Sequence, residues 1–191
     1  MVQLSTTRYG SVAQFFHWST AFLVLVAFIY GPGGSEARVY SSANEFGRRI
    51  HETLGLCVFA IAVTRLLWQA IDKRPAAAPA SRWMGVTATV VQWTLSLLLL
   101  ALPLTAVAGA WLEGHPLTFV AGIDVAPIFS RSAQTGATIA RIHTWLGDAI
   151  MWLAGLHAFA ALYHHFILGD YVLLSMLPRW IPASRSRKTH E

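Results

Sequence analysis

The chain has 191 residues, enough for one domain, and carries a net charge of +5 at pH 7. Its residues are 55% hydrophobic and only 12% charged, whereas a soluble domain has about 25% charged residues. This composition excludes an ordinary soluble domain and indicates a protein whose solvent is lipid. The positive charge does not require nucleic acid as a partner, because much of it lies in a basic tail, 178–191, suited to an anionic membrane surface.

Long apolar runs follow one another along the chain. They are four in number, at about 12–30, 50–71, 86–111 and 140–168. Each is near or above the ~20 residues that a membrane-spanning helix needs, and backbone groups in hydrocarbon must bond internally, so each run should be helical. Pro103 is expected to kink the third run. The first run lacks a cleavage site and should be retained as a helix. We predict an all-α fold, an integral membrane four-helix bundle that forms one domain over 1–191.

The distribution of basic residues predicts an orientation. Four spans place both termini on one face, called side A, together with the linker between the second and third runs. Side A carries eight basic residues: Arg8, Lys73, Arg74, Arg82, Arg179, Arg185, Arg187 and Lys188. The opposite face, side B, carries five: Arg38, Arg48, Arg49, Arg131 and Arg141. Because cytoplasmic loops are rich in Lys and Arg, we expect side A and both termini to be cytoplasmic.

Histidines are the polar residues that stand out within the runs. Polar groups at membrane depth are costly and are candidates for function. His17 lies toward side A in the first run, and His51 opens the second run at side B. His143 lies near side B in the fourth run. His157 follows fourteen residues later, after a rise of about 21 Å that ends on nearly the same helix face. His115, in a loop, is expected to be a surface residue.

Depth alone sorts these histidines into two pairs. His17 matches His157 toward side A, and His51 matches His143 toward side B. Two imidazoles that face each other across a bundle can hold a haem iron axially. We therefore predict two haems stacked across the bilayer, with these four histidines as the iron ligands.

Other interpretations of the histidines stay open. A single intramembrane histidine can hydrogen-bond to a neighbouring helix, and a proton relay is possible, although more acids would be expected in one. Zinc fits less well, because there is no cysteine set and no His-Glu-x-x-His. Gly55 and Gly147 each lie one turn after a histidine. They would leave room for a flat macrocycle or allow close helix packing.

Taken together, these residues resemble the bacterial cytochrome b561 type of di-haem membrane cytochrome, and the resemblance covers almost the whole chain. The matching pieces are His17-Trp18, His51-x-x-x-Gly55, Thr64–Trp68, Ala101-Leu102-Pro103, His143-x-x-x-Gly147, Gly155-Leu156-His157 and Leu162–Phe166. The resemblance implies a bacterial inner membrane location, two b haems with two histidine ligands each, and exchange of electrons with ubiquinone.

One branch of this family consists of superoxide oxidases, which take electrons from periplasmic superoxide and reduce ubiquinone. The resemblance to that branch favours His164 as a quinone-binding residue, with Lys73 and Arg82 as weaker candidates. Arg65 follows His51 by fourteen residues, so it should reach the depth of the side A haem and either pair with a propionate or extend to the interface. Asp148 is expected to be a buried acid.

The electron donor stays open between two functions. Superoxide is an anion, and the arginines of side B could steer it. However, Glu36, Glu45, Glu52, Glu113 and Asp124 lie on the same side and leave little net positive charge. The alternative is a quinol-linked electron-transfer cytochrome that serves a protein partner.

Overall fold

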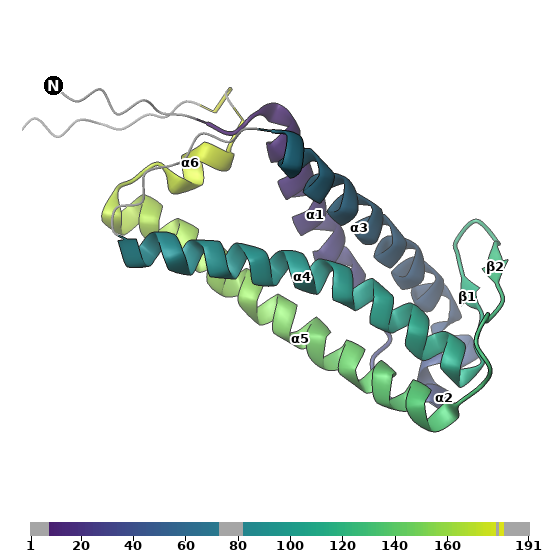
Figure 1. Ribbon diagram of the computed structural model, residues 1–191. Helices are drawn as coiled ribbons and strands as arrows, with labels where there is room; N and C mark the ends of the chain where they lie inside the picture. Colours follow the sequence, from purple (N-terminus) through teal and green to yellow (C-terminus); the bar gives the residue numbers. More distant parts are fainter. Residues whose placement is uncertain (1–7, 73–81, 179, 182–191) are drawn as a thin grey trace, which may run out of the picture.

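The computed structural model describes residues 8–72, 82–178 and 180–181, and its frame is four long helices (Figure 1). They are α1 (Ser11–Tyr30), α3 (Glu45–Ile71), α4 (Arg82–Glu113) and α5 (Ala133–Tyr163), and a π-helical segment (His164–Leu168) continues α5. All four are long and apolar enough to cross a membrane. The prediction of an all-α membrane bundle is confirmed.

The helices extend beyond the apolar runs, chiefly toward side B. The first turns of α3 are polar and are held in helical form by ion pairs one turn apart, between Arg49 and Glu45 (3.0 Å) and between Arg48 and Glu52 (3.2 Å). The helix α4 continues through Pro103. A hydropathy pattern marks only the part of a helix that lies in hydrocarbon, which explains the difference in bounds.

Side B also carries short elements that the sequence did not indicate. They are α2 (Glu36–Val39), a 3₁₀ turn (Ser42–Asn44) and two strands, β1 (Leu117–Thr118) and β2 (Asp124–Val125). The strands pair antiparallel, with Leu117 opposite Val125. Gly122, in the turn between them, has a φ of 75°, which favours glycine. Strands of two residues are too short to leave an alternating pattern in the sequence.

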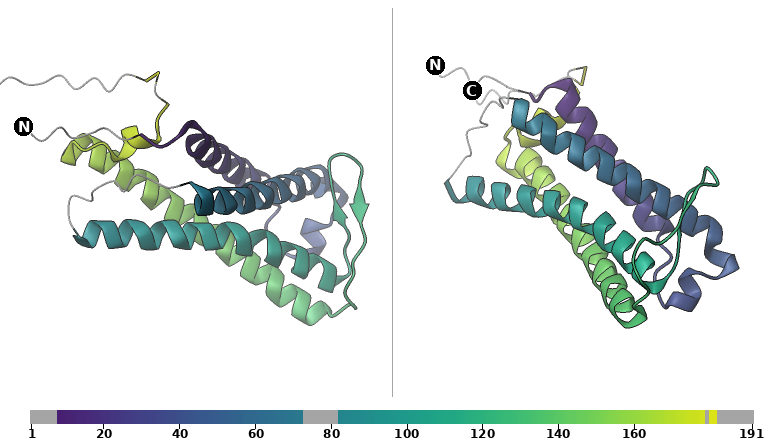
Figure 2. Two further views of the ribbon diagram at one scale, coloured as in Figure 1. Left: turned by 45° about the horizontal axis from the view of Figure 1, so that its top comes forward. Right: turned by 45° about the vertical axis from the view of Figure 1, so that its right-hand side comes forward.

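The bundle consists of two helix pairs. The helix α1 packs with α3, and α4 packs with α5, while α3 and α4 join the pairs. The two pairs lie closer together at the β1–β2 end than at the α6 end (Figures 1 and 2). At mid-length, a small apolar core of Val58, Ala62, Leu99 and Ile150 fills the space between them. The remaining surface is largely apolar, as expected where a bundle faces lipid.

The side A end is closed by α6 (Val172–Met176), which lies against the start of α1 (Figure 1). Gln14 donates hydrogen bonds to the carbonyls of Ser175 (3.2 Å) and Leu177 (2.9 Å), and Trp18 donates one to Met176 (2.9 Å). Together with the backbone N–H of Tyr9, which also donates to Ser175 (3.0 Å), these bonds satisfy carbonyls at the end of α6. The chain after α5 is thereby fixed to the first helix.

Glycine allows the close approach of α4 and α5 at side B. A Cβ on Gly136 would lie 2.7 Å from both Cγ and the backbone nitrogen of Glu113, and a Cβ on Gly109 would lie 3.2 Å from the backbone nitrogen of Ala140. A separation of 2.7 Å is too short for any side chain larger than hydrogen, and at 3.2 Å the neighbouring helix would have to shift by a few tenths of an ångström. The geometry of this helix pair therefore depends on both glycines.

Replacing Gly136 by alanine should destabilise the protein, because the added methyl group overpacks the contact with Glu113. We expect the free energy of unfolding in detergent, measured with a chemical denaturant, to fall by about 1–3 kcal/mol. Gly155→Ala is the matched control on the same helix, since its Cβ would meet no described atom within 4 Å. Equal effects of the two substitutions would contradict the packing argument.

Candidate functional site

The structure brings His51 of α3 opposite His143 of α5, toward side B. Their ring centroids lie 6.1 Å apart, with the ring planes at 86°. The Nδ1 atom of His51 lies 2.7 Å from the carbonyl oxygen of Ala27, and that of His143 lies 2.9 Å from the carbonyl oxygen of Leu102. A carbonyl oxygen only accepts, so both Nδ1 atoms carry the proton. Each Nε2 therefore presents a lone pair as the ligand atom of its ring.

His17 of α1 and His157 of α5 face each other in the same way toward side A. Their ring centroids lie 6.3 Å apart, with the planes at 64°. The charge of Arg65, on α3, acts electrostatically on both rings. Arg65 therefore lies near this pair, at the depth that its spacing from His51 predicts.

Both separations match a metal held between two imidazoles. A metal–imidazole bond is about 2 Å long, and two such bonds plus the half-width of each ring place the centroids about 6 Å apart. Imidazoles that bind metals commonly donate the other ring N–H to a backbone carbonyl, which fixes the ring. His51 and His143 both have this second bond.

The two histidines of each pair come from helices that do not pack closely against each other. Within the described residues, the main contacts are α1 with α3, α3 with α4, and α4 with α5. The facing histidines instead come from α1 and α5, and from α3 and α5. Each pair thus spans the boundary between the two halves of the bundle, where a flat group could lie between the rings.

Gly55 and Gly147 have a different environment from the glycines that pack helices. A Cβ on either would meet no described atom within 4 Å, whereas Gly109 and Gly136 lie against a neighbouring helix. Close helix packing therefore does not account for Gly55 or Gly147. Each lies one turn from a facing histidine, and the open space beside it leaves room for a flat macrocycle.

Comparison with known proteins identifies the family. The model of the family described as prokaryotic cytochrome b561 matches residues 8–179, which include all four long helices and both histidine pairs. The chain belongs to this family.

Curated relatives of this cytochrome cover nearly the same length. It is 30% identical over 177 residues to cytochrome b561 homolog 1 of Escherichia coli K12, covering 90% of this chain and 98% of that protein. It is 28% identical over 171 residues to homolog 2 of the same organism, covering 89% and 91%. It is also 28% identical over 176 residues to a probable superoxide oxidase of Yersinia pestis, covering 90% and 97%.

Membership of the family supports a coarse functional conclusion. The protein is a bacterial membrane cytochrome that binds b haem and takes part in electron transfer. The donor set fits this cofactor, because paired imidazoles are ligands of haem iron.

The side A end of the cytochrome holds His164, one of the residues predicted to bind quinone. Its Nδ1 forms a short hydrogen bond with Oδ2 of Asp170, whose Oδ1 accepts a bond from the backbone N–H of Val172 (3.0 Å). His164 begins the π-helical segment, and such turns often occur at functional sites. Its Nε2 is left to bind a ligand.

The other two residues predicted to bind quinone are Arg82 and Lys73. Arg82 lies exposed at the start of α4, and Lys73 lies outside the described residues.

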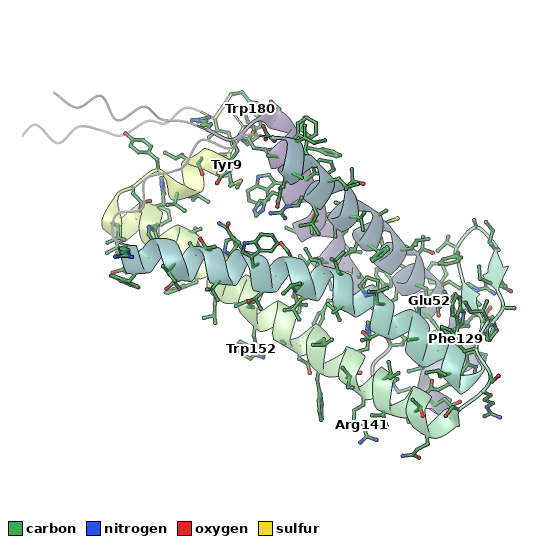
Figure 3. All side chains as sticks on the ribbon, viewed as in Figure 1. Tyr9, Glu52, Phe129, Arg141, Trp152 and Trp180 are labelled. Carbon is green, nitrogen blue, oxygen red and sulfur yellow. The ribbon has the colours of Figure 1, made fainter. Side chains whose placement is uncertain are left out.

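The prediction that Asp148 is buried is wrong. Asp148 is exposed on α5, on the same outer surface as Trp145 and Trp152 (65% and 77% exposed), and Trp152 points away from the bundle in Figure 3. Asp148 follows His143 by five residues, a rotation of about 500°, or 140° away from the histidine face. The helix period thus places it outside the haem region.

Two of the five arginines of side B, Arg48 and Arg49, are engaged by carboxylates. Arg49 pairs with Glu45 (3.0 Å) and Asp124 (3.3 Å), and Arg48 pairs with Glu52 (3.2 Å). Glu52, labelled in Figure 3, also accepts a bond from the backbone N–H of Thr118. The strand β1 is thus tied to α3, and the ion pairs agree with the expectation that side B has little net positive charge.

Proposed function

We propose that this cytochrome carries two b haems and transfers electrons from superoxide at side B to ubiquinone at side A. The proposal rests on the two histidine pairs, which lie at two depths of one bundle. The ring centroids are 6.1 Å apart in one pair and 6.3 Å apart in the other. His51 and His143 would hold the outer haem, and His17 and His157 the inner one. When bound, the haems supply one-electron carriers that connect the two faces of the membrane.

The protein residues restrict this chemistry to electron transfer. Haem held by two imidazoles would favour outer-sphere electron transfer over oxygen binding. The carbonyls of Ala27 and Leu102 fix the outer rings through their Nδ1 protons. Arg65, whose charge acts on both inner histidines, would pair with a haem propionate.

The overall reaction balances with quinone as acceptor. Two superoxide anions each lose one electron and leave as dioxygen, and one quinone takes two electrons and two protons to become a quinol. His164, hydrogen-bonded to Asp170, is the residue we assign to the quinone, through a hydrogen bond between Nε2 and an oxygen of the quinone or quinol ring. Asp170 holds the imidazole in place through this hydrogen bond. The excess of basic residues supports a cytoplasmic side A.

A quinol-linked electron-transfer cytochrome is the second candidate. The pairing of Arg48 and Arg49 with carboxylates favours it, because little unpaired positive charge then remains at α3 to attract an anion. In this alternative the same four histidines hold the haems, and electrons pass between quinol and a protein partner.

Single histidine substitutions test the pairing. His51→Ala and His143→Ala should each lose the same outer haem, while His17→Ala and His157→Ala should each lose the inner haem. Haem content and redox titration of the purified variants distinguish the two centres. His115→Ala, which changes a histidine outside both pairs, is the control and should retain both haems. Loss of one common haem from His51→Ala and His157→Ala would overturn the pairing.

Rapid mixing with superoxide tests the donor. We expect enzymatically generated superoxide to reduce the haems of the purified protein, and added ubiquinone to reoxidise them. Superoxide dismutase should abolish the reduction. Haem reduction that persists with dismutase, or haems that only quinol reduces, would reject superoxide and favour the second candidate.

His164→Ala tests the quinone assignment. The substitution removes one hydrogen bond to the quinone, worth about 1 kcal/mol. The ubiquinone concentration that gives half-maximal haem reoxidation should therefore rise about five-fold, while the haem content stays unchanged. Phe166→Leu, an exposed neighbour in the same π-helical segment, should behave as the parent protein. An unchanged quinone dependence in His164→Ala would place the quinone elsewhere.

A further inference from the structure

Three possible metal ligands from separate elements meet at side B, apart from the histidine pairs. Glu36 lies in α2, Glu113 ends α4, and His115 follows in the loop. One ligand atom from each lies within 4.8 Å of the others. Nε2 of His115 is 2.8 Å from Oε1 of Glu36. An imidazole nitrogen with two carboxylate oxygens is a donor set that Zn²⁺ accepts.

Glu113 gives this cluster a feature that exposed acidic groups lack. The residue is only 6% exposed, and its carboxylate makes no hydrogen bond or ion pair with the residues that the structure describes. The nearby cation, Arg131, donates from Nε to the backbone oxygen of Glu113 (3.0 Å) rather than to the carboxylate. A cation bound here would supply the partner that this carboxylate lacks among the described residues.

The geometry around the three ligands is held by other contacts. Gly136 of α5 lies against Cγ of Glu113, so the glutamate side chain has little room to turn away. The ring of His115 stacks on Tyr40, with centroids 3.5 Å apart and planes at 16°. The guanidinium of Arg48 lies 5.1 Å from the centre of the same Tyr40 ring. The imidazole is therefore oriented before any ion binds.

We propose that Glu36, Glu113 and His115 bind one divalent transition-metal ion, with zinc as the best match. Binding would neutralise the two carboxylates and join α2 to the end of α4 at side B. Three protein ligands leave a fourth position for water, as in open zinc sites. The site is independent of the electron donor, because none of its ligands belongs to a histidine pair.

The test is zinc binding to the full-length, tag-free cytochrome in detergent, after treatment with a chelator. Equilibrium dialysis against ZnCl₂, with metal and haem measured together, should give one zinc per chain that a large excess of Mg²⁺ does not displace. Glu113→Gln and His115→Ala should each weaken binding at least about ten-fold while the haem spectrum stays unchanged.

Two matched controls complete the design. Glu45→Gln removes a side B carboxylate outside the cluster, and His190→Ala removes a histidine from the tail; both should bind zinc as the parent does. His115→Asn provides a second loop variant that keeps a polar side chain. Binding that survives Glu113→Gln and both His115 variants, or that disappears with His190→Ala, would overturn the proposal, as would a parent protein that binds no zinc.

Discussion

The helix α5 carries two histidines fourteen residues apart, and the rest of the arrangement depends on that spacing. Fourteen residues rise about 21 Å and return to nearly the same helix face, so one helix presents an imidazole at each of two depths. The partners come from two different helices, His51 from α3 and His17 from α1. The histidines of α5 therefore face the α1/α3 helix pair at two depths. The small apolar core around Val58 and Ile150 lies between the two helix pairs.

Much of this arrangement could be predicted from the sequence because the membrane limits the choices. An apolar run in hydrocarbon must be a helix, and connected spans must alternate in direction. Once depth and direction are known, a histidine's position in its run indicates which other histidines share its level. The backbone carbonyls of Ala27 and Leu102 could not be foreseen, because they depend on how neighbouring helices are rotated and spaced.

The less successful predictions have physical causes. Asp148 was expected to be buried because of its depth, but the helix period places it about 140° from His143, on the outer face. His115 was expected to be an ordinary surface residue, yet it meets Glu36 across 79 positions of sequence. Contacts between loops depend on how each loop folds, which no periodic pattern encodes. The ion pair between Arg49 and Asp124 was hidden for the same reason, and it bears on whether an anion is attracted to side B.

The central claim is that one chain holds two b haems, each between two histidines. Haem quantification by the pyridine haemochrome method, combined with low-temperature electron paramagnetic resonance of the oxidised parent protein, tests it most directly. We expect two haems per chain, both low-spin with bis-histidine signals. A single haem per chain, or a high-spin centre with an open axial position, would contradict it.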